Sequence, residues 1–177
     1  MDLLETPHLL TAEEYATIDT EARTELLGGF IYDVAPRNDP HRHASRELNR
    51  LLARGIADDQ RVQIADSVAI PDWKGRDAPE VDVAVLKSRG PFVTGPTSAD
   101  ALVLIEIAHA TYRLDRGYKI PLYVRAGVPA FIVNVEKRQV EYYGSEADLD
   151  ATHGQGASEG EAVAILGIDI PVTSLFE

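Results

Sequence analysis

The strongest constraint on the fold is an apolar run that a single carboxylate interrupts. Residues 102–107 read LVLIEI, and Glu106 is their only charged member. Strand alternation places Glu106 on one face with Leu104, and Ile105 and Ile107 on the other. A segment that is apolar on both faces is typical of a central strand covered on both sides. An unpaired carboxylate there costs on the order of several kcal/mol, so the sequence predicts a partner that holds its charge.

A second apolar strand carries the same exception. Residues 79–86 read PEVDVAVL, and alternation places Asp82 with Ala84 on one face and Val83 on the other. If the two strands are neighbours, Asp82 and Glu106 converge, and each raises the pKa of the other unless a cation lies between them. Such a pair suits Mg²⁺, which proteins bind through one or two carboxylates together with water and substrate phosphate. The spacing leaves an alternative open, in which backbone N–H groups or arginines satisfy both carboxylates.

A helical pattern follows Glu106. Asp115, Lys119 and Tyr123 recur every four residues and therefore lie roughly on one helix face. Pro121 lies inside this pattern, which predicts a kink just before it or a helix that starts there. An aspartate and a glutamate on adjacent strands, with a lysine close by, are typical of metal-dependent phosphodiester hydrolysis.

The order of these motifs resembles one protein family. The segments PEVDVAVL, VLIEIAHAT and RLDRGYKIPLYVRAGVPAFIV, preceded by TAEEY, ELLGGFIYDVAP and His41, are similar to those of the Uma-two family of restriction-endonuclease-like proteins. The resemblance covers residues 10–143 and places the chain in the PD-(D/E)XK nuclease superfamily. It implies an α/β fold with a restriction-endonuclease-like core, in which helices flank a central mixed β-sheet. It also implies an endonuclease that acts on DNA with Mg²⁺, or Mn²⁺, as a homodimer.

The same resemblance implies a role for each candidate residue. Asp82 and Glu106 are expected to bind the metal. Lys119 is expected to take the place of the superfamily lysine that usually lies two residues after the glutamate, where this chain has Ala108. Glu25 corresponds to an extra acidic catalytic residue that related nucleases bring from an N-terminal helix. The residues expected to support this catalytic group are His41, Asp115 and Tyr123.

Length and composition bound the remaining possibilities. The 177 residues are 45% hydrophobic and 26% charged, so we expect one globular domain over residues 1–177. The absence of cysteine excludes disulfides, thiolate zinc sites and a cysteine nucleophile. The sequence has no signal-type apolar segment and no run of about 18 apolar residues, so we expect a cytoplasmic protein that does not contact membranes.

The net charge of −12 argues against a nuclease function, because DNA affinity depends largely on neutralisation of the phosphates by lysine and arginine. The helical pattern over residues 40–56 offers local positive charge. Arg42, Arg46 and Arg50 recur every four residues opposite an apolar stripe, and could contact phosphates. The alternative is a solubilising face whose arginines pair with neighbouring acidic residues.

Other patterns predict the rest of the fold. Thr11 and Glu14 form a capping box that starts a short N-terminal helix. Residues 20–27 are expected to form a second short helical turn that carries Glu25. We expect strands over 30–35, 61–70, 130–135 and 139–143, a mobile acidic loop over 144–161, and a final strand or strand pair over 162–176.

Three classes of function are compatible with these patterns. The first is a Mg²⁺-dependent DNA endonuclease. The second is a catalytically weak or inactive nuclease-fold protein that serves as a binding or assembly module, which the acidity favours. The third is another hydrolase built on a carboxylate pair, such as a glycosidase, in which the carboxyl groups lie about 5 Å or more apart.

Overall fold

The computed structural model describes residues 8–70, 75–93, 95–150 and 155–177. Its centre is a six-stranded sheet in the order β3-β4-β5-β6-β7-β8. The strands of this sheet are β3 Arg61–Ser67, β4 Glu80–Leu86, β5 Ala101–Ala108, β6 Ala130–Asn134, β7 Gln139–Tyr143 and β8 Gln155–Ser158. Only β5 and β6 pair in parallel, and all other neighbours are antiparallel. The predicted mixed sheet is therefore confirmed.

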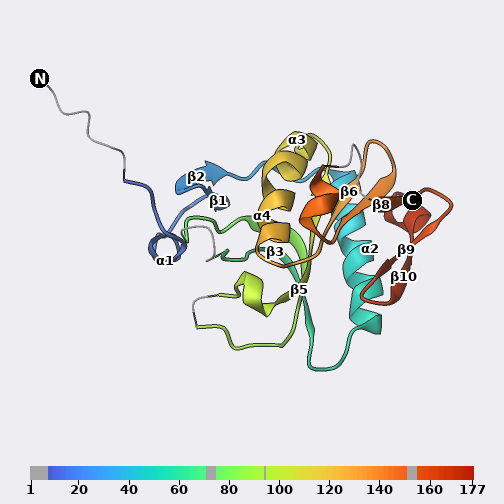
Figure 1. The fold of residues 1–177 in the computed structure, drawn as a ribbon, viewed down its shortest axis with the longest axis horizontal. Coiled ribbons are helices and arrows are strands. Elements are labelled where there is room, and N and C mark those ends of the chain that lie inside the picture. The colour runs from blue at the N-terminus through green and yellow to red at the C-terminus, as the bar shows by residue number, and fades with distance from the viewer. Residues whose placement is uncertain (1–7, 71–74, 94, 151–154) are drawn as a thin grey trace, which may run out of the picture.

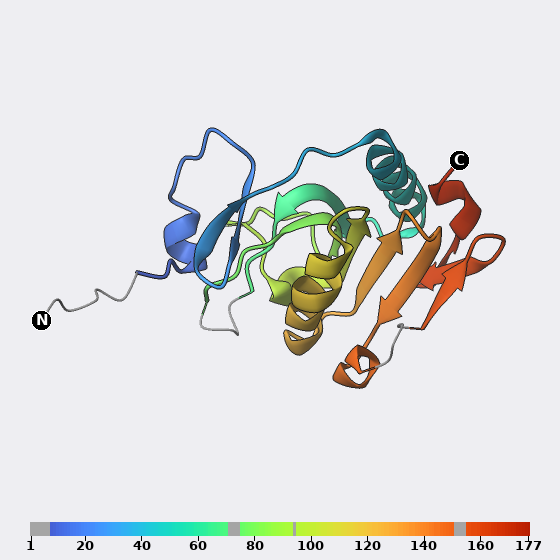
Figure 2. The same ribbon diagram turned by 90° about the horizontal axis from the view of Figure 1, so that it is seen from above.

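Helices cover both faces of the sheet. On one face lies α2, which spans Asp39–Gly55. The other face is covered by a continuous helical segment made of α3 Tyr112–Leu114, the π-helical η2 Asp115–Lys119 and α4 Ile120–Arg125. Figure 2 shows the sheet between α2 and this second segment. Shorter elements complete the chain: α1 Ala12–Tyr15, η1 Ser98–Asp100, η3 Glu146–Leu149 and η4 Val172–Leu175.

The alternation predicted for the central strand is confirmed by the two apolar cores. Leu104 packs into the core beneath α4, whereas Ile105 and Ile107 pack into the core beneath α2. Every residue of β4 is buried as well. Glu106 and Asp82 are thus buried carboxylates in two central strands, on the α4 side of the sheet.

The N-terminal part differs from its prediction. The capping box of Thr11 and Glu14 is present, and α1 starts directly after Thr11. Residues 20–27, however, do not form a helical turn, because Thr24–Leu27 is strand β1 and pairs with β2 Phe30–Asp33. Gly28 and Gly29 both have positive φ, at 60° and 88°, which is the geometry of a two-residue hairpin turn whose twist matches the strands. Glu25 therefore comes from a strand rather than from a helix.

Pro121 changes the helix ahead of it. The Ile120 N–H donates to the Asp115 carbonyl, five residues back, so residues 115–119 form a wide π-helical turn. Pro121 then lies in the first turn of α4, where its missing N–H has no partner to lose. The prediction of a helix that starts just before Pro121 is thus confirmed for α4.

The C-terminal region also contains more structure than predicted. The acidic segment 144–161 is not simply a loop, because it holds η3 and the edge strand β8, while residues 151–154 lie outside the described residues. The expected final strand pair is the hairpin of β9 Ala162–Ile165 and β10 Ile168–Pro171. In Figure 1 this hairpin and the β1–β2 hairpin lie at opposite ends of the molecule.

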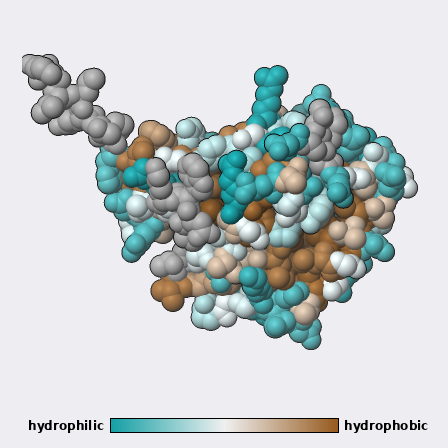
Figure 3. All heavy atoms as spheres, in the orientation of Figure 1, coloured by the Kyte–Doolittle hydropathy of each residue, from teal (hydrophilic) through white to brown (hydrophobic). Residues whose placement is uncertain are grey.

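The surface is mixed in character. On the face drawn in Figure 3, hydrophilic side chains follow most of the outline, and apolar side chains gather in the lower right part. Within the described parts of the chain, no helix is both long enough and apolar enough to cross a membrane.

Candidate active site

A pocket of about 300 Å³ opens at one end of the central strands, between the β1–β2 hairpin, the start of α2 and the α3–η2 segment. Six of the seven side chains predicted from the sequence line it: Glu25, His41, Asp82, Glu106, Asp115 and Lys119. The seventh, Tyr123, donates a 2.5 Å hydrogen bond to Glu106 from behind. The structure therefore brings all seven together, although they come from six different elements.

Asp82 is held by three positively polarised groups. Its Oδ1 accepts from the guanidinium of Arg37 at 3.0 Å. Its Oδ2 accepts from the Ile107 N–H at 2.9 Å and lies 3.0 Å from Nε2 of His41. Burial favours the neutral acid, but His41, the Ile107 N–H and Arg37 outweigh it and hold the pKa of Asp82 below its usual value. Asp82 is therefore ionised at neutral pH.

Glu106 is in the opposite situation. The side chain is 2% exposed, and it contacts the Tyr123 hydroxyl and the Lys119 ammonium, whose Nζ lies 3.6 Å from Oε1. Burial raises the pKa of Glu106 well above its usual value, Lys119 offsets part of this, and Asp82 and Asp115 add to it by repulsion. Positive charge brought beside Glu106 would therefore favour its ionised form.

Lys119 is the buried cation of the pocket. Its Nζ lies 2.8 Å from Glu25 Oε2 and donates at 3.0 Å to the backbone carbonyl of Glu80. Burial acts to lower the pKa of Lys119, but the carboxylates of Glu106, Glu25 and Asp115 outweigh burial and raise it. The ammonium therefore stays charged and aims into the pocket from η2.

Glu25 reaches the pocket in an unforeseen way. Glu25 pairs with Tyr32 of β2 in the hairpin, and its side chain is 5% exposed, with the carboxylate against Lys119. The Glu80 N–H also donates to Glu25, at 3.3 Å. Glu25 thus positions the lysine, whichever element carries it.

Two side chains of the pocket were missed by the sequence prediction. Glu80 lies two residues before Asp82 on the same strand face, so strand alternation could have identified it. Arg37 lies in the connection between β2 and α2, where no periodic pattern points inward. Its guanidinium bridges the two carboxylates, and the guanidinium of Arg23 also binds Glu80.

His41 lies in the first turn of α2, as expected for a helix-start residue. The side chain of Asn38 caps this helix by accepting from the His41 N–H at 3.0 Å. The imidazole points to Asp82, and its Nδ1 is buried with no hydrogen-bond partner among the described residues. A buried ring nitrogen without a partner shows that the polar part of this site is incomplete.

The donor atoms of the pocket suit a hard divalent cation held by few protein ligands. Among the residues that the structure describes, no three His, Asp or Glu side chains are grouped so as to hold a metal ion. Asp82 and Glu106, however, converge from adjacent strands onto an open cavity, and proteins often bind Mg²⁺ through one or two carboxylates plus water. Asp82 is also in contact with the guanidinium of Arg37 at this position.

Comparison with known proteins agrees with this geometry. The family model of Uma2, described as "Putative restriction endonuclease", matches residues 12–172. The chain belongs to the Uma2 family. The fold is also similar to the crystal structure of a "putative nuclease belonging to DUF820" from Anabaena variabilis ATCC 29413, with a TM-score of 0.72 and 14% sequence identity over 94% of this chain and 97% of that one. No curated protein matches the chain.

The three regularly spaced arginines of α2 in this Uma2 chain, Arg42, Arg46 and Arg50, do not line the pocket. The buried side of α2 carries Leu48 and Leu52, and the arginines follow the opposite, solvent side of the helix. Arg42 pairs with Asp39, and Arg50 pairs with Glu47 at 2.7 Å. These pairs are those of a solubilising face, although exposed ion pairs are weak enough to exchange for phosphate contacts.

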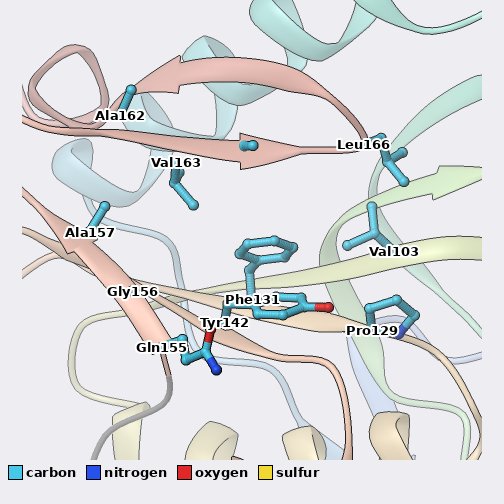
Figure 4. Close-up of a pocket in the computed structure, with 11 residues that line it drawn as sticks. Val103, Pro129, Phe131, Tyr142, Gln155, Gly156, Ala157, Ala162, Val163 and Leu166 are labelled. Atoms are coloured by element: carbon cyan, nitrogen blue, oxygen red, sulfur yellow. The ribbon is translucent and has the colours of Figure 1, made fainter.

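A second pocket of about 350 Å³ lies between the sheet and the β9–β10 hairpin, away from these residues. Figure 4 shows Phe131 and Tyr142 at its base and Val163 and Leu166 at its other side. Its lining is apolar apart from Gln155 and the hydroxyl of Tyr142, and it has no titratable acid or base that could assist a hydrolysis. The smaller polar pocket is therefore the candidate active site of the Uma2 chain.

The environment of Asp115 predicts a pH-dependent stability. Burial raises the pKa of Asp115 to about 6, although Lys119 and a 2.7 Å hydrogen bond from Thr111 oppose this. Asp115 thus has a higher pKa in the native state than in the unfolded chain, where its pKa is 3.8. Ionisation of Asp115 therefore lowers the free energy of unfolding as the pH rises from about 4 to about 6. Urea unfolding across this range should show a fall in wild-type stability that is smaller in Asp115→Asn, in which Glu106, whose pKa is also raised by burial, still contributes.

Asp148→Asn is the control for this experiment. The N–H groups of Ser145 and Gly144 lower the pKa of the exposed Asp148, so its ionised form favours the folded state. That contribution is complete above the unfolded value of 3.8, so Asp148→Asn should differ from wild type by a nearly constant amount from pH 4 to pH 6 and approach it only at lower pH. Parallel curves for wild type and Asp115→Asn would contradict the prediction.

Proposed function

We propose that the chain is a Mg²⁺-dependent endonuclease of the PD-(D/E)XK type, which hydrolyses phosphodiester bonds in DNA. The observation that carries the proposal is the convergence of Asp82, Glu106 and the buried ammonium of Lys119 on one open pocket. Membership of the Uma2 family supports the nuclease class over a glycosidase. A buried lysine between two acids also suits a reaction that develops negative charge at phosphorus.

Asp82 and Glu106 would hold the metal, Mg²⁺ or Mn²⁺. When bound, such an ion lowers the pKa of a coordinated water and polarises the scissile phosphate. Asp82 is ionised already, and the positive charge of the ion would favour ionisation of Glu106. The Tyr123 hydroxyl fixes the orientation of Glu106, and the Ile107 N–H and His41 fix that of Asp82.

Lys119 would stabilise the negative charge that develops on the phosphate oxygens or orient the attacking water. Its position depends on Glu25, at 2.8 Å, and on the carbonyl of Glu80. Asp115 adds a further negative charge that keeps the ammonium protonated. These residues act by holding charge and orientation, so no side-chain nucleophile is required.

Access of DNA to an acidic protein needs local positive charge. In the proposal Arg42, Arg46 and Arg50 contact the phosphate backbone along the solvent side of α2, by exchanging surface carboxylate partners such as Asp39 and Glu47 for phosphates. We further propose a homodimer, so that two sites can cut two strands, and a cytoplasmic location.

A second candidate function is a nuclease-fold module without catalysis. The observation that favours it is the contact of Arg37 with Asp82, because a carboxylate that is held by an arginine has less capacity for a metal ion. The net charge of −12 also favours a module without catalysis, because it weakens attraction to DNA phosphates.

Incubation with supercoiled plasmid separates the two candidates. The wild-type protein should convert the plasmid to nicked or linear form with Mg²⁺ or Mn²⁺ and stop when EDTA removes the metal. Asp82→Asn, which keeps the shape of the side chain, should be inactive. Cleavage that survives this substitution would place the reaction elsewhere, whereas absence of both cleavage and saturable metal binding would favour the assembly module.

A further inference from the structure

Arg37 binds two carboxylates of the pocket, Glu80 and Asp82. The sequence patterns did not identify it, and the proposed catalytic group does not use it. It lies between β2 and α2, and its side chain is 16% exposed. One guanidinium nitrogen, Nη2, donates to Glu80 Oε1 at 2.5 Å and to Asp82 Oδ1 at 3.0 Å, while Nε donates to Asp82 at 3.2 Å. The guanidinium therefore lies between two carboxylates of the same strand.

The charges around Arg37 are balanced without any added ion. Glu80 and Asp82 supply two negative charges, and Arg23 and Arg37 supply two positive ones in direct contact with them. The buried carboxylates of β4 thus have counter-ions from the chain itself. A divalent cation at Asp82 would add two positive charges next to the Arg37 guanidinium, and like charges at such separations repel strongly when partly buried. Cation and guanidinium therefore compete for Asp82.

The position of Glu80 defines where Arg37 can go. Its carboxylate is 7% exposed and lies two residues before Asp82, so it can retain one side of the guanidinium when Asp82 is released. A guanidinium presents several N–H donors in a fixed planar arrangement and binds phosphate oxygens well. A partly displaced Arg37 would remain at the rim of the pocket, where a substrate phosphate must enter.

We propose that Arg37 is the built-in counter-ion of Asp82, that a divalent metal displaces it, and that the displaced guanidinium, still held by Glu80, binds a phosphate oxygen of the substrate. This role rests on the proposed function and deepens it. It makes Arg37 a positioning residue that couples metal loading to substrate binding. In the metal-free protein the same contact neutralises Asp82 and disfavours the entry of the ion.

The test is a pair of binding measurements on Arg37→Gln that move in opposite directions. Titration calorimetry with Mn²⁺ alone should give an affinity about tenfold higher than wild type, equivalent to ~1.4 kcal/mol, because the competing cation is gone. Binding of a short DNA duplex, measured by fluorescence anisotropy with saturating Ca²⁺, should be about tenfold weaker. A variant that merely damages the fold would lower both affinities.

Arg23→Gln is the matched control, because Arg23 binds Glu80 and forms no ion pair with Asp82 in the part of the chain that the structure describes. Its Mn²⁺ affinity should stay within about threefold of wild type, a difference of under ~0.7 kcal/mol. If Arg23→Gln and Arg37→Gln gain Mn²⁺ affinity equally, the gain comes only from the loss of a nearby positive charge, and the proposal is overturned. Arg37→Lys, which keeps the charge but cannot bridge two carboxylates bidentately, should also bind Mn²⁺ more tightly than wild type, and serves if the glutamine variant does not fold.

The outcomes also separate this role from the proposed function. If wild type binds Mn²⁺ and neither Arg37 variant binds it more tightly, the counter-ion role is wrong while the metal site stands. If wild type and all variants show no saturable binding of Mn²⁺, the metal site itself is overturned, and the role of Arg37 falls with it.

Discussion

Replacement of Lys119 by methionine should destabilise the folded protein by about 3–5 kcal/mol at pH 7, because removal of one partner of a buried ion pair leaves an uncompensated charge. Lys119 is 6% exposed, and its ammonium lies 2.8 Å from Glu25 and 3.6 Å from Glu106. Methionine fills a similar volume, so the loss would come from the charge rather than from a cavity. Cleavage activity should be lost as well, since the same group is proposed to face the phosphate.

The pH dependence gives this prediction a sharper form. The pKa of Lys119 is raised above 10.5, so its ammonium stays protonated throughout the pH range of this experiment. Lys119 partly offsets the rise that burial causes in the pKa of Glu106, so without the ammonium Glu106 binds a proton more readily as the pH falls. Urea unfolding should therefore show a larger deficit for the variant at pH 7 than at pH 5.

Lys87→Met provides the comparison. Lys87 is exposed and donates to the Ala99 carbonyl, so its replacement should change stability by no more than about 0.5 kcal/mol. A Lys119→Met variant that is as stable as Lys87→Met would mean that the buried carboxylates are already neutral in the folded protein.

Replacement of Glu106 by glutamine should separate activity from stability. The variant is expected to lose at least about 1,000-fold in the rate of metal-dependent cleavage, because a metal ion contributes several kcal/mol and each 1.36 kcal/mol is tenfold. At the same time it should be more stable than wild type at pH 7. Burial raises the pKa of Glu106 well above 4.5, so the native state prefers the neutral acid and loses stability as the pH rises from 4.5 towards that value.

A second buried glutamate offers a matched control. Glu141 on β7 is 3% exposed, lies opposite Ile132 as Glu106 does, and accepts from the Tyr112 hydroxyl at 3.1 Å. It is not among the lining residues of the candidate active site. Glu141→Gln should keep cleavage within about threefold of wild type, a difference of under ~0.7 kcal/mol in the barrier. Equal loss of activity in both variants would indicate damage to the sheet rather than loss of a metal ligand.

Much of the site could be predicted from the sequence because it depends on short-range periodicity. Alternation within two apolar strands identified Asp82 and Glu106, and the spacing of four residues identified Asp115, Lys119 and Tyr123. The π-helical turn does not separate Lys119 from Tyr123, since both still reach Glu106. Patterns of this kind hold wherever a strand or helix is locally regular.

Features that depend on partners distant in sequence could not be predicted in the same way. The segment of Glu25 pairs as a strand because a glycine turn returns the chain against it, which overrides its local helical signal. Arg37 lies in an irregular connection, and only the fold brings it to Glu80 and Asp82. Strand β8 forms in a polar, glycine-rich segment because β7 offers it an edge, at Gln139–Tyr143. Tertiary context of this kind outweighs intrinsic propensity.

The hydrogen bond from Ile120 to Asp115 has a consequence for how the sequence can vary in length. One helical turn there accommodates more residues than an α-helix would. Deletion of a single residue between 115 and 119 would restore an ordinary α-helical turn, which covers about the same rotation with one residue fewer, so the residues on either side would keep nearly their present phase. The helix should therefore tolerate a one-residue deletion here, provided that Asp115 and Lys119 are kept.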